Sequence, residues 1–291
     1  MSLGDSVKFT LGIPVYNEEK NIGLLLSEIE SWKKDIEIIV VSSGSSDSTD
    51  NIVRSFRDVK LVVEESRKGK VSALNKITSM ARGDVIIFTD GDVLLEKESI
   101  DALEKHFEDR DAVACTGRVV PIDGNSIIMN RLSLISCQVW DEHRINCVHS
   151  GGFLYPTGYL HAVRKSVIKT IDIDNQVIND DAVIGVLLFD QGITYKYCRE
   201  AVVKVKFPDN LSDYFRQKVR TRLGRRQKSS CKILIDQEKE LIRVLWSLNN
   251  VETTYSILLH FLDLTAKAIA FLKHFNISNK ANLWVEVKST K

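Results

Sequence analysis

The sequence predicts an α/β fold, in which a mostly parallel, Rossmann-like sheet is flanked by helices and followed by a C-terminal helical extension. Over residues 7–92, four short apolar segments alternate with three helical patterns. This strand–helix alternation is typical of a right-handed, doubly wound parallel sheet. Polar loops follow the strands, where ligands of open α/β sheets bind. Residues 236–275 are helical in pattern without intervening strands, which indicates the extension.

The composition is that of an ordinary globular protein. The 291 residues are 44% hydrophobic and 27% charged, enough for one large α/β domain with an appendage or for two domains. The net charge of +1 gives no support for a nucleic-acid partner, and none is expected. Five cysteines are scattered without C-x-x-C spacing, and the first residues lack the apolar core of a signal peptide. We therefore expect a cytoplasmic protein with reduced thiols.

Hydrophobic periodicity places the individual elements of the first half. The first helical pattern carries apolar residues at i, i+3, i+4 and i+7, and Asn17 or Asn21 is expected to cap it. Strands are predicted at 7–13, 36–41, 59–63 and 85–89, and helices at 21–32, 49–56 and 70–82.

The fourth strand ends in two carboxylates, Asp90 and Asp92, separated by Gly91. At the carboxyl end of a buried strand these side chains would project into a crevice, and the glycine would let a ligand approach the backbone. Hard oxygen ligands on a short turn suit Mg²⁺ or Mn²⁺. Taken alone, the same residues also fit a solvated acidic turn.

Two further loops can face an anion. Small hydroxyl residues and a glycine follow the second strand at 42–50, and a basic Arg67-Lys68-Gly69-Lys70 turn precedes the third helix. Free backbone N–H groups and cations at helix starts bind phosphates. A solvated basic loop is the alternative for 67–70.

The second half is predicted with less regularity. A helix starting near residue 96 runs to 107, a strand covers 113–120, and a helical pattern covers 127–140. His143 and His149 follow and are candidates to reach the site. Further elements are predicted as a helix at 182–191, strands at 192–197 and 201–205, and a helix that starts near residues 208–213.

A second acidic pair, Asp180 and Asp181, opens the helix at 182–191. A carboxylate there can act as a general base. Acidic residues are also favoured at helix N-termini for electrostatic reasons alone. Asn179 would be a good N-cap residue, so the alternative is that this segment caps the helix and takes no part in catalysis.

Four motifs in order resemble those of the family 2 glycosyltransferases, which have the GT-A fold. The resemblance covers about residues 8–225. The matching segments are Pro14-Val15-Tyr16-Asn17-Glu18-Glu19, Ser43-Gly44-Ser45-Ser46-Asp47-Ser48-Thr49, Gly69-Lys70-Val71-Ser72-Ala73-Leu74-Asn75 and Asp90-Gly91-Asp92.

This resemblance implies a donor site for a nucleotide-diphosphate sugar, UDP-linked by default. Tyr16 would lie against the nucleobase, with the loop around Pro14 and Glu18 at base and ribose. The family's paired acidic positions are Ser42 and Ser43 here, so a hydroxyl of Ser43 would replace the acidic base contact. The other implied donor residues are Lys70 at the phosphates or sugar, Asp90 and Gly91 at ribose or metal water, and Asp92, with Asp90, on Mn²⁺ or Mg²⁺.

The resemblance also implies the acceptor side. Gly152 and Phe153, with Arg164 further on, are similar to a G-x-F…R element beside the acceptor and donor sugar. Asp180 and Asp181 match an E-D motif whose last residue is the catalytic base of an inverting reaction.

A third part of the resemblance lies in the helix after residue 210. Gln217 and Arg220 resemble a Q-x-x-R-W motif that reaches the diphosphate. Thr221 stands in place of the Trp, which argues against a long-chain polymerase.

We predict a glycosyltransferase domain at residues 1–230, with a nucleotide-binding half at about 7–120 and an acceptor half at about 121–230. A helical extension at 231–291 follows. The basic segment 216–232 and the helix 253–275 leave open a peripheral contact with the inner face of a membrane, and the acceptor is expected to be a glycan or a lipid-linked saccharide. Asp263 and Lys267 interrupt the apolar run of that helix and disfavour a membrane span. Packing on the domain or homodimerisation are the alternatives for this helix.

Two other functions stay open at this stage. A sugar-1-phosphate nucleotidyltransferase also uses an α/β sheet with acidic metal ligands, but it normally opens with a glycine-rich basic loop after the first strand. A sugar-nucleotide-binding protein without turnover would explain Ser42, Ser43 and Thr221, whereas Asp92 and Asp181 oppose it.

Overall fold

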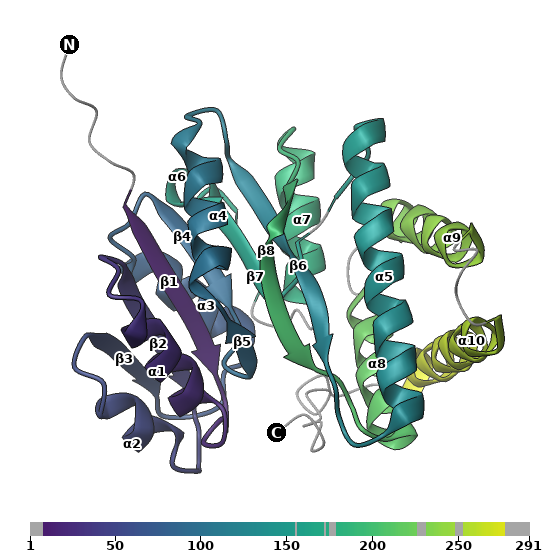
Figure 1. Cartoon of the computed structure of the whole chain (residues 1–291), viewed down its shortest axis with the longest axis horizontal. Coiled ribbons are helices and arrows are strands. Elements are labelled where there is room, and N and C mark those ends of the chain that lie inside the picture. The colour runs from purple at the N-terminus through teal and green to yellow at the C-terminus, as the bar shows by residue number, and fades with distance from the viewer. Residues whose placement is uncertain are drawn as a thin grey trace.

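The computed structural model describes residues 8–154, 156–171, 173–174, 179–225, 231–247 and 253–276. Within these residues an eight-stranded mixed sheet crosses the molecule in the order β3-β2-β1-β4-β7-β6-β8-β5 (Figure 1). The strands are β1 (Phe9–Val15), β2 (Glu37–Ser43), β3 (Val59–Glu64), β4 (Val85–Thr89), β5 (Val93–Leu95), β6 (Ala114–Ile122), β7 (Leu160–Arg164) and β8 (Lys196–Lys206). The helices are α1 (Ile22–Ser31), α2 (Thr49–Arg54), α3 (Lys70–Met80), α4 (Lys97–Glu108), α5 (Ile127–Ser150), α6 (Lys165–Ile168), α7 (Asp180–Asp190), α8 (Leu211–Arg225), α9 (Cys231–Ser247) and α10 (Thr253–Asn276).

The first four strands form the predicted parallel half. β1 pairs in parallel with both β2 and β4, and β2 pairs in parallel with β3. The chain order therefore reverses between β1 and β4, which is the switch point where open α/β sheets bind ligands. β1 and β2 each extend two residues beyond their predicted ends, through Val15 and Ser43. Pro14 is tolerated near the end of β1, and the small buried side chains Ser42 and Ser43 continue the ladder of β2.

The second half of the sheet departs from the predicted pattern. β7 runs antiparallel to both β4 and β6, and β5 is a short strand that pairs antiparallel with β8. The segment 93–95 was expected to lead into a helix, and its strand pairing depends on β8, more than 100 residues later. β8 begins at Lys196, so residues 192–195 are not in a strand. α5 continues ten residues beyond its predicted end.

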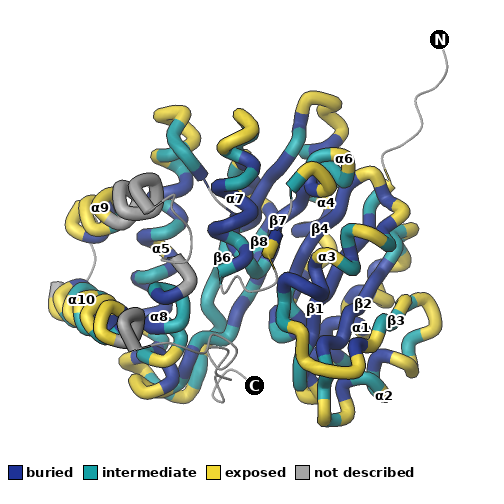
Figure 2. Tube along the Cα trace, turned by 180° about the vertical axis from the view of Figure 1, so that it is seen from behind, coloured by how far each residue is buried: buried dark blue, intermediate teal, exposed yellow. Residues whose placement is uncertain are grey.

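Helices cover both faces of the sheet. One core joins β1 side chains to α1, α2 and α4, and the other joins β2 and β4 side chains to α3, α6 and α7. Figure 2 shows these strands as buried between the two helical layers. Asn21 is the N-cap residue of α1, but its side chain makes no cap hydrogen bond, because its amide donates to Glu18 (3.0 Å). The Asn17 side-chain oxygen accepts from the Ser46 N–H (2.8 Å).

A third group of helices, α5, α8, α9 and α10, stands beyond β6 and β8 (Figure 1). The tail is two helices, separated by residues 248–252, which lie outside the described residues. Both pack onto the preceding domain, because one apolar cluster contains side chains of α5, α8, α9 and α10. The domain boundary at 230 stays a prediction.

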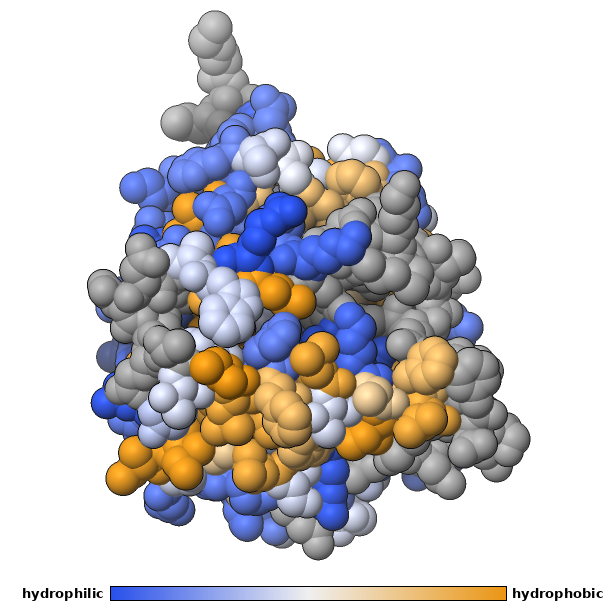
Figure 3. Space-filling view, turned by 90° about the vertical axis from the view of Figure 1, so that its right-hand side faces the viewer, coloured by the Kyte–Doolittle hydropathy of each residue, from blue (hydrophilic) through white to orange (hydrophobic). Residues whose placement is uncertain are grey.

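The last helix was expected to carry one apolar stripe, and the described members of this stripe face outward. The stripe consists of Ile257, Phe261, Leu264, Ala268, Phe271 and Phe275. Leu259, Leu262, Ala266 and Ala270 pack inward, whereas Phe261 is 63% exposed. Figure 3, which views the side of the molecule that carries α9 and α10, shows a band of apolar side chains across its lower half. Exposed large apolar residues of α9 and α10 are Ile242, Trp246, Ile257, Phe261, Leu264, Phe271 and Leu272. Phe275 carries no described side chain.

In the described part of the chain, one helical stretch, Thr254–Leu272, is long and apolar enough to cross a membrane by length and composition alone. Its Asp263 is paired with Lys218 and Arg222 of α8 (3.7 and 3.2 Å). Two cations of the basic segment 216–232, Lys218 and Arg222, are thus paired with α10. Residues 226–230 of that segment lie outside the described residues.

Candidate active site

A cleft of about 350 Å³ opens at the carboxyl ends of β1, β2 and β4 and extends between α5, α7 and α8. Its walls bring together residues that are more than 200 positions apart, from Pro14 to Thr221. The predicted site residues that line it are Pro14, Tyr16, Glu18, Ser43, Lys70, Asp90, Gly91, Asp92, Asp180, Asp181, Gln217 and Arg220.

Gly152 and Phe153, which were predicted on the acceptor side, are not among the residues that line the cleft. α5 runs to Ser150 and ends at Gly151 in the left-handed conformation (φ 66°), so the chain turns away at this point. The Phe153 ring packs edge-on against Phe189 of α7, with 5.0 Å between ring centroids. Neither His143 nor His149 lines the cleft.

Residues 156–159, which the sequence reasoning did not single out, line the cleft at this side. The Thr89 hydroxyl donates to the Tyr159 carbonyl (2.7 Å), and the Thr157 N–H donates to the Thr116 hydroxyl (2.9 Å). These bonds fix the loop to β4 and β6. Gly158 lies two residues before β7, the strand that ends at Arg164.

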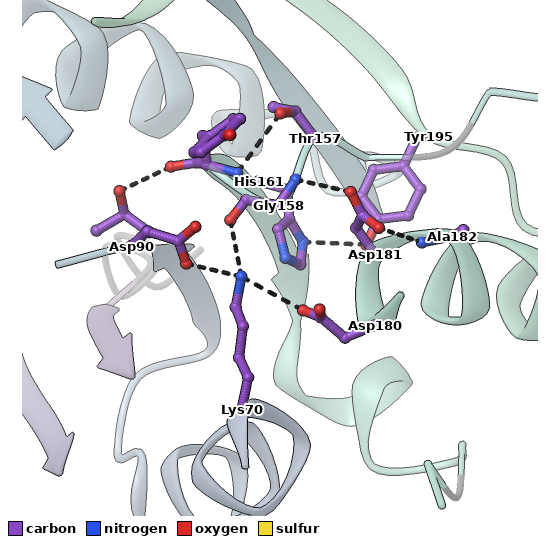
Figure 4. Close-up of polar contacts among 11 residues, drawn as sticks. Lys70, Asp90, Thr157, Gly158, His161, Asp180, Asp181, Ala182 and Tyr195 are labelled. Atoms are coloured by element: carbon purple, nitrogen blue, oxygen red, sulfur yellow. Dashed lines mark hydrogen bonds and ion pairs between the residues drawn. The ribbon is translucent and has the colours of Figure 1, made fainter. Parts of the chain in front are cut away.

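Lys70, the first residue of α3, stands at the centre of the acidic groups (Figure 4). Its Nζ lies 2.7 Å from an Asp90 oxygen and 3.5 Å from an Asp180 oxygen, and it donates to the Gly158 carbonyl at 3.4 Å. Burial alone would lower the pKa of Lys70, but the Asp180 and Asp90 carboxylates outweigh it and raise that pKa well above its usual value. Lys70 therefore stays protonated between two carboxylates, Asp90 at the end of β4 and Asp180 at the start of α7.

Asp181 is held in the first turn of α7 by two backbone donors. The Gly158 N–H donates to its Oδ2 (3.1 Å), and the Ala182 N–H donates to its Oδ1 (2.7 Å). Asn179 makes no side-chain cap hydrogen bond. Figure 4 shows Asp181 on the opposite side of Gly158 from Asp90.

Asp90 and Asp92 form a carboxylate pair that fits a divalent cation. Burial, with the Asp90 and Glu18 carboxylates adding to it, raises the pKa of Asp92 to about 7. Negative charge crowded in this way is stabilised by a bound cation, and two carboxylates with remaining positions for phosphates and water suit Mg²⁺ or Mn²⁺. Among the described residues no group of three or more His, Cys, Asp or Glu side chains is arranged to hold a metal ion.

Gly91 is required here by packing. A Cβ on Gly91 would lie 2.7 Å from a Val15 methyl carbon, closer than side chains approach one another. Because residue 91 is glycine, the Asp90-Gly91-Asp92 turn can pack against the end of β1. This role adds to the ligand access that was predicted from the sequence.

Ser43 lines the cleft, but its hydroxyl is fully engaged. It donates to Glu64 (2.6 Å) and accepts from the backbone N–H groups of Lys68 and Gly69 (3.0 and 3.1 Å). A serine hydroxyl has one proton and two lone pairs, so no position is left for a nucleobase in this arrangement. Glu64, whose side chain is completely buried, also accepts from Ser72 (2.7 Å). Ser42 and Ser43 replace the acidic residues expected on β2, and the carboxylate of Glu64 on β3 lies next to Ser43 instead.

Arg67 was not singled out within the basic turn, although it has a specific position. Its guanidinium lies over the Tyr16 ring, 3.9 Å from the ring centroid. The turn is held against β2 because Gly44 (φ 72°) leaves room for it: a Cβ there would lie 2.4 Å from the Arg67 nitrogen.

The far wall of the cleft comes from one face of α5, which the sequence reasoning missed. The lining residues of this helix recur at helical spacing, and that periodicity was the available signal. They are Ser133, Ser136, Cys137, Trp140 and Arg144.

Comparisons with known proteins agree with this geometry. The sequence model described as "Glycosyl transferase family 2" matches residues 10–171. The chain is 28% identical over 237 residues to "Probable glycosyltransferase YdaM" of Bacillus subtilis, which covers 75% of this chain and 55% of that protein. It is 26% identical over 223 residues to the poly-beta-1,6-N-acetyl-D-glucosamine synthase of Staphylococcus epidermidis, covering 72% and 52%. The chain thus spans about half the length of the curated relatives it matches.

Solved structures share the fold. The mannosyltransferase PcManGT from Pyrobaculum calidifontis, in complex with GDP-Man and Mn²⁺, aligns with a TM-score of 0.57 at 19% identity and covers 94% of this chain and 76% of its own. Glucosyl-3-phosphoglycerate synthase from Mycobacterium tuberculosis, with Mn²⁺, UDP and phosphoglyceric acid, aligns with a TM-score of 0.54 at 16% identity, covering 79% and 78%. At these identities the likeness establishes the fold, which is GT-A with C-terminal helices.

Proposed function

This chain belongs to glycosyl transferase family 2, and from that premise we propose that it is an inverting, metal-dependent enzyme that moves a sugar from a nucleotide-diphosphate sugar to a glycan or lipid-linked acceptor. The observation that carries the proposal is the placement of Asp92 and Asp181. They come from opposite halves of the chain and line one cleft, with the Lys70 ammonium between their neighbours Asp90 and Asp180.

The donor end of the cleft supplies binding. Tyr16, Pro14 and Glu18 lie where the nucleoside would enter, and Lys70 and Arg220 are cations suited to the diphosphate. Gln217 lies three residues before Arg220 on α8, so the two share a helix face. Asp92 and Asp90 would hold Mn²⁺ or Mg²⁺, which neutralises diphosphate charge when bound. The solved neighbours that contain Mn²⁺ with GDP-Man or UDP support this assignment.

The other end supplies the base. Asp181 would accept the proton of an acceptor hydroxyl as its oxygen bonds to the anomeric carbon, while the bond from that carbon to the diphosphate oxygen breaks. The hydroxyl attacks from the face opposite the leaving group, so the anomeric configuration inverts. The Gly158 N–H bond to Asp181 orients this carboxylate before the acceptor binds.

The test is a panel of UDP-, GDP- and other nucleotide sugars incubated with the protein and Mn²⁺, with released nucleoside diphosphate as the readout. We expect release with at least one donor and its loss on chelation. Protein that binds a donor without releasing diphosphate with any acceptor would instead be a sugar-nucleotide-binding protein. Pyrophosphate release from a nucleoside triphosphate and a sugar-1-phosphate would indicate a nucleotidyltransferase.

For the outward face of α10 we propose contact with a lipid surface on the cytoplasmic side of a membrane. One side of this helix is anchored to α8 through Asp263, and the opposite side exposes Ile257, Phe261, Leu264 and Leu272, the last 66% exposed. A helix with one side held by protein and one apolar side open fits an interfacial position. Its exposed cation Lys267 suits anionic headgroups.

Sedimentation with anionic phospholipid vesicles tests this contact. Phe261→Glu is expected to abolish binding, whereas Leu24→Glu, a change at an equally exposed leucine of α1, should leave it intact. A dimer in solution that Phe261→Glu dissociates, without vesicle binding, would assign the face to a second copy instead.

A further inference from the structure

Arg144 is a buried cation in the cleft wall that the proposed chemistry does not use. It lies on α5, is 5% exposed and lines the cleft. Its Nε is buried and has no hydrogen-bond partner among the described residues. A buried donor of a charged group without a partner is costly unless something satisfies it.

The nearby carboxylate does not serve Arg144. Asp141, one turn earlier on the same helix, is paired with Arg118 (3.2 Å) and Arg199 (3.0 Å) and accepts from the Tyr197 hydroxyl (2.5 Å). Within the described part of the chain no ion pair to Arg144 is found. Positive charge is therefore left in the cleft wall at this point.

Two aromatic rings hold the guanidinium in place. It lies 5.3 Å from the Trp140 ring centroid and 5.9 Å from that of Tyr197. Cation–π contacts of this kind hold an arginine near the rings without consuming its N–H donors. The N–H donors of Arg144 therefore stay available to an anion in the cleft.

The position of this cation relates it to the acceptor. Trp140 packs against Ala182 and Val186 of α7, and Ala182 directly follows the proposed base Asp181. Lys218 of α8, which also lines the cleft, adds a second cation, although it shares Asp263 with Arg222. The residues proposed to hold the metal and the diphosphate, Asp90, Asp92 and Lys70, line the cleft at the strand ends instead.

We propose that Arg144, stacked on Trp140, forms an anion subsite that binds a phosphate or carboxylate group of the acceptor. This rests on the proposed glycosyl transfer and narrows its acceptor to molecules that carry such a group close to the reacting hydroxyl. The guanidinium supplies charge-assisted, bidentate recognition, which neutral glycans do not exploit.

The first arm of the test needs no variant. Release of nucleoside diphosphate from the donor found active above is measured with pairs of acceptors. Glycerol 3-phosphate and glycerate are each compared with glycerol, and a polyprenyl phosphate in detergent is compared with the matching polyprenol. The proposal expects an anionic member of a pair to be used at least tenfold better than its neutral counterpart. The soluble pair and the lipid pair distinguish the two sources of the anion.

The second arm uses Arg144→Met, with Arg144→Lys as the charge-retaining variant and Arg131→Met, on the exposed face of α5, as the matched control. Loss of a charge-assisted hydrogen bond predicts an acceptor KM raised roughly tenfold to a hundredfold in Arg144→Met, partly restored in Arg144→Lys. The donor KM should change much less, and nucleotide-induced thermal stabilisation reports that the fold is kept.

Equal use of anionic and neutral acceptors, or an unchanged acceptor KM in Arg144→Met, overturns the anion subsite while leaving glycosyl transfer intact. Absence of donor turnover with every acceptor, despite correct folding, overturns the proposed function itself. An Arg144→Met protein that does not fold leaves the decision to the first arm.

Discussion

The two halves of the cleft are built by different rules. The proposed donor half is a set of loops at the ends of adjacent parallel strands, where Tyr16, Ser43 and Asp90 are brought together by the sheet itself. The proposed acceptor half is assembled from α5, the 156–159 loop, α7 and α8, whose positions depend on packing between distant segments. Residues at strand ends can be assigned to a ligand site from the local sequence pattern. Residues on helix faces can be assigned only once the elements that pack against the helix are known.

The largest effect that separates the halves is expected from Asp181→Asn. An amide at this position cannot take up a proton, so transfer should fall by roughly 10²–10⁴-fold, as for loss of a general base. Metal-dependent nucleotide binding, a property of the other half, should persist. Steady-state transfer and nucleotide titration measure the two, with the exposed Asp190→Asn on the same helix as control. Full transfer by Asp181→Asn would remove the assigned base.

Metal binding should depend on pH through Asp92. Its folded pKa of about 7 lies above the ordinary value of 3.8, so below pH 7 the cation must displace a proton. Mn²⁺ affinity should then fall by up to about tenfold per pH unit between pH 7 and 5. A group with a raised pKa binds more protons when folded, so without metal the free energy of unfolding should decrease as pH rises from about 4 to 7.

Titration of Mn²⁺ in the presence of nucleoside diphosphate at several pH values tests this dependence. Asp92→Asn should weaken Mn²⁺-dependent nucleotide binding strongly and remove most of the pH response. The control Asp84→Asn, at the opposite, exposed end of β4, should change neither. Equal Mn²⁺ affinity at pH 5 and pH 7 would contradict the assignment.

Gly158→Ala tests the boundary between the halves. A Cβ there would lie 3.4 Å from both the Asp181 Oδ2 and the Lys70 Nζ, an ordinary contact distance, so the fold should tolerate it. The added methyl would occupy space between the donor-side cation and the base. We expect transfer to fall by roughly tenfold, the scale of a small misplacement of reacting groups. Wild-type kcat with unchanged KM values would show that this space is unused.

A smaller effect is expected from Glu64→Gln. The change removes the charge that holds Ser43 and, through it, the turn that carries Arg67 and Lys70. Loss of a buried charge-assisted hydrogen bond costs about 1.5–3 kcal/mol, part of which should appear as nucleotide affinity lowered about three- to tenfold. Calorimetric titration of the nucleotide, with the exposed neighbour Glu65→Gln as control, measures it. Identical affinities in both variants would leave Glu64 with no role in the donor half.

This contrast also explains what the sequence could predict. The D-G-D turn, the Lys70 turn and the order of the first four strands follow from local periodicity and strand-end chemistry, and the structure places them together. The family resemblance located Asp180, Asp181, Gln217 and Arg220, because their motifs are short and local.

The errors have one physical cause. β5 forms only because β8 pairs with it from 100 residues away, and Gly158 joins the site only because Thr89 and Thr116 bind its loop. The role of Ser43 depends on Glu64, which lies on the next strand. The inward and outward faces of α10 depend on α5 and α8, because both faces are apolar in sequence. None of these partners is visible in a local pattern.

The central claim is that one cleft carries out a single displacement, with the leaving diphosphate at the Asp92 end and the base Asp181 opposite. Proton NMR of the first product formed from an α-linked donor sugar, recorded before anomeric equilibration, tests it most directly. The account predicts a β-linked product, with the anomeric configuration inverted. An α-linked product would show retention, and Asp181 could not then be the base of a one-step transfer.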